Sequence, residues 1–376
     1  MFQQVETPRL ILDRAVLQRN ADRFLARAAA ADVVLRPHLK TAKSIAVAKV
    51  ATGGRMSTVT VSTLKEAERF AAAGFDDILY AVGISPNKLS RVQRISDETG
   101  KRILVITDNR PMAEAMAAFS RDTGFRLQVL LEIDSGEGRG GLPPRSPELV
   151  EIGRSLAEAP GLDFRGVITH AGHSYAVADP AAIADIAEAE RRSATDAAVA
   201  LRDAGIACEI VSVGSTPTFL HARSFEGVTE ARCGVYAFFD LAQLSRNVCA
   251  VEDIALTVLA SVIGHNRKAG TILIDAGALA LSKDVSANTF MSDAHYGHVC
   301  DPLTMQRLGE LSVAVVHQEH GSIPVEDRIW FERLPIGSLV RILPNHACMT
   351  AAAGYESYLV VDGDRITAEW DRFNGW

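Results

Sequence analysis

The sequence has 376 residues, of which 48% are hydrophobic and 23% are charged, and its formal net charge is −7. That length exceeds the ~250–300 residues that a single hydrophobic core supports, so we expect a globular protein of two domains. The acidic balance argues against a nucleic-acid partner, and no apolar run reaches the ~20 residues of a membrane span.

Short apolar runs alternate with alanine-rich stretches between about residue 30 and residue 235. This alternation predicts a parallel sheet with helical crossovers, and eight such units favour a (β/α)8 barrel of the TIM type over an open sheet. The predicted helices are Lys65–Ala73, Arg110–Arg121, Pro147–Ala159 and Pro180–Ala204. The predicted strands are Val33–Arg36, Thr58–Val61, Ile78–Val82, Ile103–Thr107, Leu127–Ile133, Gly166–His170, Glu209–Val213 and Val228–Arg232.

The pattern changes after about residue 245, where β-branched runs are separated by turns and long helical stretches are few. This composition predicts a mostly β C-terminal domain, so the fold class is α/β with a β-rich addition. The strands predicted there are Leu256–Ile263, Thr271–Ile274, Leu311–Val316, Ser338–Ile342 and Tyr358–Val361.

The first predicted barrel strand leads into a lysine. Pro37 cannot donate a ladder hydrogen bond, so a regular strand ends near it and Lys40 follows at the carboxyl end. A lysine in a dry pocket has a lowered pKa and can react with a carbonyl, whereas most lysines are simply exposed.

The loop after Leu127–Ile133 resembles a dinucleotide-binding fingerprint, because Gly136, Gly138 and Gly141 satisfy G-x-G-x-x-G. However, prolines 143 and 144 follow at once, and no helix starts on the third glycine as that site requires. We therefore do not expect a dinucleotide site there.

Two further stretches carry chemistry. Gly214-Ser215-Thr216 follows a predicted strand, where glycine permits close backbone approach and hydroxyls suit a phosphate, although a plain turn has the same residues. His346 and Cys348 are two apart, so in extended chain they point the same way, and imidazole with thiolate favours Zn²⁺. Two protein ligands are fewer than the three usual in a catalytic zinc site, so water, substrate or another side chain must supply the remaining ligands.

The motif Arg36-Pro37-His38-x-Lys40-Thr41, preceded by Thr7-Pro8, resembles the fold-type III pyridoxal-phosphate (PLP) enzymes. More narrowly, it is similar to the D-serine dehydratase, D-threo-3-hydroxyaspartate dehydratase and D-threonine aldolase group, with its alanine racemase-like barrel. The resemblance runs over essentially the whole chain. It implies that Lys40 carries PLP, with Lys43 as the alternative. It also implies that a strand at about Arg9–Asp13 joins the β domain, which gives domains 14–245 and 1–13 plus 246–376.

The same resemblance implies the cofactor contacts. Gly214, Ser215 and Thr216 would hold the phosphate, and His170 would stack on the pyridine ring. The partner of the pyridine nitrogen is left open between Arg232 and Glu230. Further cofactor contacts implied in this way are Arg139, Tyr175 and Tyr236.

By the same resemblance, His346 and Cys348 bind a divalent metal, with Zn²⁺ expected and Mn²⁺ as the alternative. Glu319 and His320 are candidates for supporting that site. The implied activity is conversion of a D-3-hydroxy-amino acid, either D-serine or D-threo-3-hydroxyaspartate, to a 2-oxo acid and ammonia. Aldolase members carry aspartate where Cys348 stands, so the cysteine favours dehydration.

Three other functions remain open. One is an aldolase on D-threonine or 3-hydroxy-D-aspartate, and another is an amino-acid racemase. The last is a non-catalytic PLP-binding protein, although such carriers are single barrels and lack the β domain expected after residue 245.

The expected partner is a small D-amino acid, and the resemblance implies a homodimer. The five cysteines are scattered and odd in number, which favours reduced thiols and a cytoplasmic location. The N-terminal residues show no basic region followed by an apolar core, so we expect no signal peptide.

Overall fold

The computed structural model describes residues 1–352 and 354–376. The chain divides into two compact units, and each of them combines segments that are distant in sequence. The predicted domain limits at residues 13 and 245 stay a prediction. The first unit comprises Met1–Ala21, Thr41–Val47 and Val235–Asn374, and the second comprises Asp22–Lys40, Ala48–Gly234 and Gly375–Trp376.

The second unit is an eight-stranded parallel sheet curled into a barrel, as predicted. The strand order is β2-β9-β8-β7-β6-β5-β4-β3, and a parallel bridge between His38 and Thr60 joins the two ends of that order. Most of the strands are near-continuous apolar runs, as expected where both faces of a parallel sheet are covered. The strands are β2 (Val34–Leu35), β3 (Thr58–Val61), β4 (Asp77–Gly83), β5 (Arg102–Thr107), β6 (Leu127–Ile133), β7 (Leu162–Thr169), β8 (Ile210–Val213) and β9 (Glu230–Ala231).

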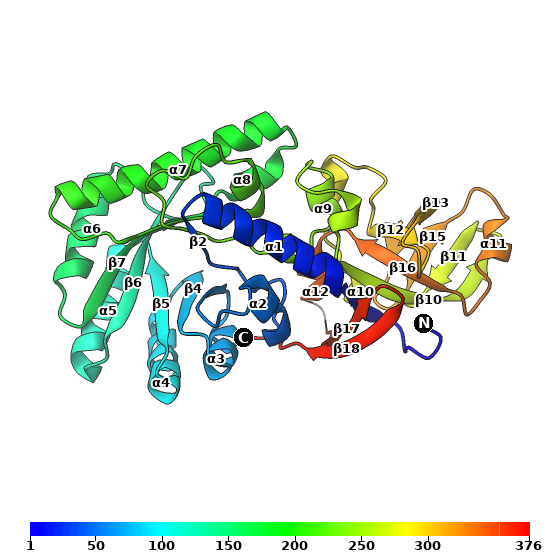
Figure 1. Cartoon of the computed structure of the whole chain (residues 1–376), viewed down its shortest axis with the longest axis horizontal. Coiled ribbons are helices and arrows are strands. Elements are labelled where there is room, and N and C mark those ends of the chain that lie inside the picture. The colour runs from blue at the N-terminus through cyan, green and yellow to red at the C-terminus, as the bar shows by residue number, and fades with distance from the viewer. Residues whose placement is uncertain (353) are drawn as a thin grey trace. The chain divides into compact units, whose positions relative to one another are not determined.

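Helices cover the outside of these strands (Figure 1). Three of these helices begin at residues that favour a helix start. Asn109, Ser146 and Asp179 are the N-cap residues, whose side chains accept hydrogen bonds from the first helical turn, and a proline follows each within two residues. The four predicted helices are confirmed as α3 (Leu64–Ala72), α5 (Arg110–Thr123), α6 (Pro147–Glu158) and α7 (Pro180–Asp203). Further helices are α1 (Arg14–Ala30), α2 (Ile45–Ala51), α4 (Leu89–Thr99) and α8 (Thr216–His221).

The first unit is mostly β-structure, as predicted. Its main path runs β13-β12-β16-β10-β1-β17-β18, and β11, β14 and β15 pair beside it. The strands are β1 (Arg9–Asp13), β10 (Leu256–Asn266), β11 (Thr271–Ile274), β12 (Gly297–Cys300), β13 (Arg307–Ser312), β14 (Val315–Val316), β15 (Gly321–Pro324), β16 (Leu339–Pro344), β17 (Ser357–Asp362) and β18 (Arg365–Asp371). Short helices interrupt them, namely α9 (Leu241–Leu244), α10 (Ala278–Leu281), α11 (Trp330–Arg333) and α12 (Ala347–Ala351).

The N-terminal strand β1 lies in the middle of this sheet. It pairs antiparallel with β10 and parallel with β17, and Leu10, Ile11 and Leu12 are completely buried. The strand expected at about Arg9–Asp13 therefore has the bounds and the place in the β domain that the family resemblance implied. The single strand predicted at Leu311–Val316 is instead the end of β13 and the separate β14.

Candidate functional site

The carboxyl ends of the barrel strands bring several predicted cofactor residues together. His170 follows β7 directly, and its Nδ1 lies 2.5 Å from the carbonyl oxygen of Gly214, which follows β8. A carbonyl only accepts, so Nδ1 carries the proton and Nε2 is the unprotonated nitrogen. Burial lowers the pKa of His170 to about 3, and the nearby positive charges of Lys40, Arg232 and Arg139 act in the same direction against the Gly214 hydrogen bond. The imidazole is therefore neutral.

Gly214 is packed too tightly for any other residue. A Cβ there would lie 2.3 Å from the carbonyl oxygen of Arg232. The close approach of the β8 and β9 ends therefore requires glycine at the start of the predicted phosphate segment.

The hydroxyl groups after Gly214 form a buried cluster. Ser215 Oγ lies 2.9 Å from Thr218 Oγ1 and 3.1 Å from Ser174 Oγ. Thr216 Oγ1 is buried and has no protein hydrogen-bond partner. A buried hydroxyl without a partner is costly, so a ligand with acceptor oxygens at this place would relieve that cost. The residues therefore fit a phosphate group.

Lys40 lies in a turn beyond β2, two residues after His38, which forms the bridge to Thr60 that closes the barrel. Its side chain is exposed rather than held in a dry pocket. Its charge nevertheless contributes to the lowered pKa of His170, so the two side chains share one electrostatic environment.

The remaining predicted cofactor contacts lie at different places. Tyr175 is near His170, with 6.5 Å between ring centroids. Arg139 is 59% exposed and lies 3.6 Å from Glu137. Tyr236 is completely buried in the short 3₁₀ turn Val235–Ala237, which belongs to the other unit. As cofactor contacts, all three stay predictions.

The barrel structure bears on two questions from the sequence: the glycine-rich loop after β6, and the surroundings of Arg232 and Glu230. The loop after β6 leads to no helix before Pro147, so the dinucleotide interpretation fails on structure as well. Arg232 is buried and donates to Ser212 Oγ and to the carbonyl oxygens of Val213 and Thr169. Glu230 accepts hydrogen bonds from Arg36 and Ser212.

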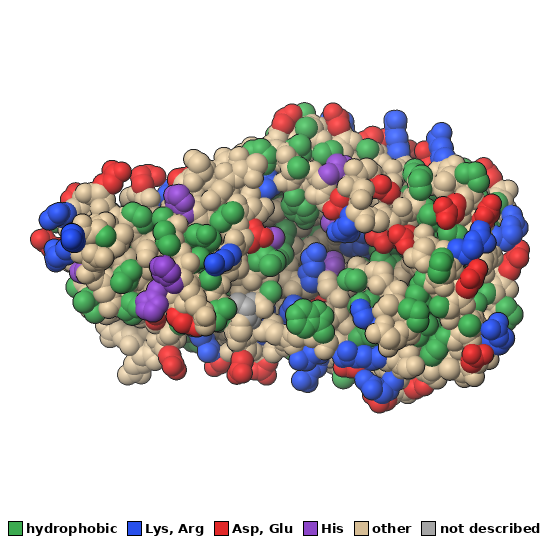
Figure 2. Space-filling view, turned by 180° about the vertical axis from the view of Figure 1, so that it is seen from behind, with side chains coloured by type: hydrophobic (Ala, Val, Ile, Leu, Met, Phe, Trp, Pro, Cys, Tyr) green, Lys and Arg blue, Asp and Glu red, His purple; other side chains and the backbone are tan. Residues whose placement is uncertain are grey.

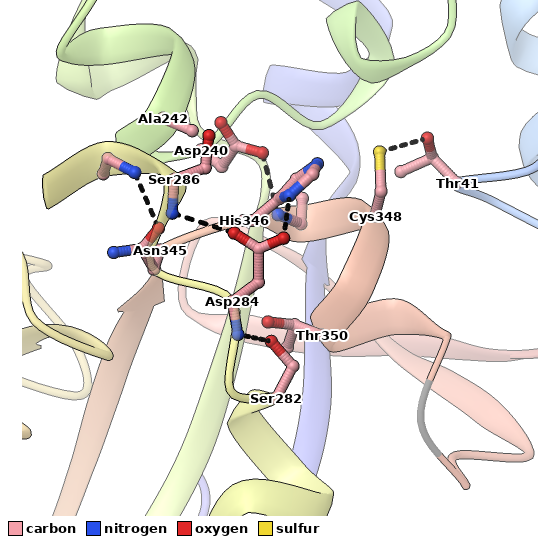
Figure 3. A network of polar contacts seen from close by, with 12 residues as sticks. Thr41, Asp240, Ala242, Ser282, Asp284, Ser286, Asn345, His346, Cys348 and Thr350 are labelled. Atoms are coloured by element: carbon pink, nitrogen blue, oxygen red, sulfur yellow. Dashed lines mark hydrogen bonds and ion pairs between the residues drawn. The ribbon is translucent and has the colours of Figure 1, made fainter. Parts of the chain in front are cut away.

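The predicted metal ligands lie at the start of α12, in the first unit (Figure 3). His346 is the N-cap residue of this helix and Cys348 is its second residue. The chain is therefore not extended there, and the argument that residues two apart in an extended chain point the same way was wrong. The helical turn nevertheless brings the pair together, because the imidazole and the thiol are within hydrogen-bonding reach. Cys348 Sγ also lies 2.9 Å from Thr41 Oγ1.

Asp284 orients the His346 ring, and the sequence did not indicate it. His346 Nδ1 lies 3.1 Å from Asp284 Oδ2, while Asp284 Oδ1 accepts a hydrogen bond from the Ser286 amide at 2.8 Å (Figure 3). The carboxylate accepts from Nδ1, so Nε2 is the ring nitrogen that could bind a metal after losing its proton. Carboxylate–histidine pairs of this kind are typical of protein metal sites. The donor set of imidazole and thiol therefore fits a soft divalent ion such as Zn²⁺.

Nearby negative charges favour the protonated form of His346, so metal binding there would release a proton. Burial opposes the imidazolium, but Cys348, Asp284 and Asp240 outweigh it and raise the pKa of His346 to about 11. The hydrogen bond from His346 lowers the pKa of Asp284 despite its partial burial. Across residues 1–352 and 354–376, no group of three or more His, Cys, Asp or Glu side chains is arranged to hold a metal ion. Glu319 and His320 are exposed.

Charged side chains of both signs lie on the surface. On the face drawn in Figure 2, Lys and Arg side chains are interspersed with Asp and Glu side chains. Within the described part of the chain, none of the helices has the length and apolarity needed to cross a bilayer.

Comparison with known families gives two adjoining matches. Residues 12–242 match the family described as alanine racemase, N-terminal domain, and residues 255–361 match a putative serine dehydratase domain.

Individual relatives extend over nearly the whole chain. A D-threo-3-hydroxyaspartate dehydratase of Delftia sp. (strain HT23) is 43% identical over 99% of this chain and 98% of its own length. Its solved structure has a TM-score of 0.96 and 42% identity, covering 100% of this chain and 99% of that one. Another solved structure, with the same score and coverage, is a cysteine-to-alanine mutant of a D-threo-3-hydroxyaspartate dehydratase in the metal-free form.

Two more distant relatives carry different names. A D-serine dehydratase of Dictyostelium discoideum is 31% identical over 96% of this chain and 94% of its own length. A 3-hydroxy-D-aspartate aldolase of Paracoccus denitrificans (strain Pd 1222) is 30% identical over 98% of this chain and 91% of its own length.

Proposed function

Because the chain belongs to the fold-type III pyridoxal-phosphate family, with an alanine racemase-like barrel and a serine dehydratase domain, we propose that it is a metal-dependent dehydratase. It converts a D-3-hydroxy-amino acid to a 2-oxo acid and ammonia, with D-threo-3-hydroxyaspartate and D-serine as the proposed substrates. The observation that carries the proposal is the His346–Cys348 pair, an imidazole beside a thiol in a chain 43% identical to a dehydratase.

The barrel residues have distinct roles in this proposal. Lys40 would hold the cofactor, and its amine would take the proton from the substrate Cα. Gly214, Ser215 and Thr216 would hold the phosphate, and the neutral His170 ring would face the pyridine ring without adding a charge. Bound PLP supplies an electron sink for the substrate Cα. Arg139, Tyr175 and Tyr236 complete the proposed cofactor contacts.

The metal residues act on the leaving hydroxyl. His346 Nε2 and Cys348 Sγ would hold the ion, for which we propose Zn²⁺ with Mn²⁺ as the alternative, and Asp284 fixes the imidazole. A bound divalent ion supplies Lewis acidity, which a poor leaving group such as hydroxide needs. A homodimer and a cytoplasmic location complete the proposal. The second is supported by five free cysteines and the first only by the resemblance.

The reaction is tested by its products. We expect 2-oxo acid and ammonia from D-threo-3-hydroxyaspartate or D-serine, lost on EDTA treatment and restored by Zn²⁺ or Mn²⁺. The Cys348→Ala variant should lose turnover and keep the absorbance of bound PLP, because Lys40 and Cys348 are separate attachments. Borohydride reduction followed by peptide mapping should place the label on Lys40 rather than on Lys43.

A different product pattern would replace the proposal. If glycine and an aldehyde form from D-threonine faster than ammonia forms from any 3-hydroxy-amino acid, the enzyme is an aldolase. If neither Lys40 nor Lys43 is labelled, the assignment of the cofactor is wrong.

A further inference from the structure

A glutamate on the outer helix α7 reaches into the barrel end. Glu190 is only 2% exposed. Its Oε1 accepts hydrogen bonds from the backbone amides of Ala171 and Gly214, each at 3.0 Å, and its Oε2 accepts from Thr218 Oγ1 at 2.7 Å. Ala171 follows His170, and Gly214 begins the predicted phosphate segment. One carboxylate thus ties the loops after β7 and β8 together.

The environment of Glu190 shows why an acid stands there. Burial raises the pKa of Glu190, and the hydrogen bonds from Thr218, Gly214 and Ala171 and the charge of Arg232 offset only part of that rise. All three neighbouring groups donate to the carboxylate, and an ionised carboxylate only accepts, so the hydrogen-bond geometry assigns the ionised form.

An ionised Glu190 fixes the direction of every hydroxyl in the cluster. The Thr218 hydroxyl proton goes to Glu190, so in the contact between Thr218 Oγ1 and Ser215 Oγ it is Ser215 that donates. Because the Ser215 hydroxyl donates its proton to Thr218 Oγ1, Ser174 must be the donor in the hydrogen bond between Ser174 Oγ and Ser215 Oγ. Ser215 Oγ also accepts from the Thr218 amide at 3.2 Å.

Thr216 lies outside this chain of hydrogen bonds. Its hydroxyl is buried and has no protein partner, so its proton is uncommitted. Of the two hydroxyls in the segment Gly214-Ser215-Thr216, only that of Thr216 is free to donate to an added acceptor.

We propose that Glu190 is a positioning residue for the phosphate of the cofactor: it joins the two loops and commits the Ser215 proton, so that Thr216 is the side-chain donor to the phosphate. This inference rests on the proposed use of PLP and assigns different roles to two residues that the resemblance treats alike.

The first test compares the two hydroxyls. Dissociation constants are measured for PLP and for pyridoxal, which lacks the phosphate, with wild-type protein, Thr216→Val and Ser215→Ala. A hydrogen bond to a charged group contributes about 1.5–3 kcal/mol, so Thr216→Val should weaken PLP binding about tenfold or more and change pyridoxal binding less than about twofold. Ser215→Ala should weaken PLP binding less than Thr216→Val does.

The second test addresses Glu190. In Glu190→Gln, the amide oxygen can still accept from Ala171 and Gly214, but the amide nitrogen donates to Thr218 and reverses the hydroxyl chain. The Ser215 proton then becomes available to the phosphate. The penalty of Thr216→Val should therefore be several-fold smaller in the Glu190→Gln background than in wild type. Glu188→Gln is the control, because Glu188 is on the same helix and pairs with Arg191 and Arg192 outside the cluster.

The outcomes separate this inference from the proposed function. Wild-type protein that binds neither PLP nor pyridoxal overturns both. Tight PLP binding that Thr216→Val leaves unchanged, or a Ser215→Ala penalty that exceeds the Thr216→Val penalty, overturns the inference alone. An equal Thr216→Val penalty in both backgrounds also overturns it. If Glu190→Gln does not fold, the comparison of Thr216→Val with Ser215→Ala still decides.

Discussion

At the scale of single residues, His170 shows how the barrel sets a protonation state. Burial and three nearby cations lower its pKa to about 3, while an unfolded chain gives histidine a pKa near 6.5. Between these two values the unfolded state binds one more proton than the folded state. The free energy of unfolding therefore falls as pH is lowered through this window.

We accordingly expect His170→Gln to flatten the pH dependence of stability. Urea denaturation between pH 7 and pH 4 should show a steeper loss of stability for wild-type protein than for the variant. His317→Gln is the matched control, because His317 is exposed, and it should keep the wild-type slope. Equal slopes for all three proteins would mean that His170 is not held neutral.

At the scale of elements, the β7–β8 pairing depends on one glycine. Gly166 lies opposite Ile210, and a Cβ at Gly166 would lie 2.0 Å from the Ile210 carbonyl oxygen. Its φ of +143° also disfavours other residues. Strands β7 and β8, which lead into His170 and Gly214, therefore approach more closely than a side chain allows.

Gly166→Ala should force these strands apart and reduce the free energy of unfolding by about 1–3 kcal/mol. Gly83→Ala is the control, since Gly83 ends β4 with no atom within 4 Å of the added carbon, and its effect should stay within about 0.5 kcal/mol. Chemical denaturation followed by circular dichroism measures both changes. Similar losses in the two variants would show that the close approach is not limiting.

Some strands could be predicted from the sequence and others could not. The barrel strands were predictable because strands covered on both faces are apolar throughout, as Leu127–Ile133 illustrates. β15 was missed because it is four residues long and has glycine and proline at its ends, and β18 because most of its residues are exposed and polar.

The candidate site was predictable where a motif is local and hidden where partners are distant. Gly214-Ser215-Thr216 and His346 with Cys348 are contiguous or nearly so, and can be recognised in the sequence. Asp284 is 62 positions from His346, and no local pattern joins them. In the sequence, Glu190 has the pattern of a surface residue on an alanine-rich helix, whereas in the structure it is buried.

At the scale of the whole molecule, the closed barrel contains an ion network at its seam. Arg36, directly after β2, lies 2.8 Å from Glu230 of β9 and 2.8 Å from Asp77 of β4. Burial opposes its charge, but the two carboxylates outweigh this and raise the pKa of Arg36. The network therefore links strands on both sides of the place where β2 meets β3.

Removing that guanidinium should leave two carboxylates poorly compensated. We expect Arg36→Met to lower the free energy of unfolding by about 3–5 kcal/mol, as measured by urea denaturation. Arg91→Met, which breaks ion pairs to Glu68 at the partly exposed surface, should cost about 0–1 kcal/mol. Equal losses would argue that the seam is held by the apolar core instead.

The place of β1 in the sheet of the first unit has a consequence for synthesis on the ribosome. Leu10, Ile11 and Leu12 are translated before the barrel sequence, yet their pairing partners β10 and β17 are translated only after it. Domains usually fold as their chains emerge, N-terminal parts first. Strand β1 therefore stays without its pairing partners while the barrel sequence is translated. We expect a nascent chain stalled before residue 256 to bind a holdase chaperone at its N-terminus, and a chain stalled after release of residue 362 to lose that binding.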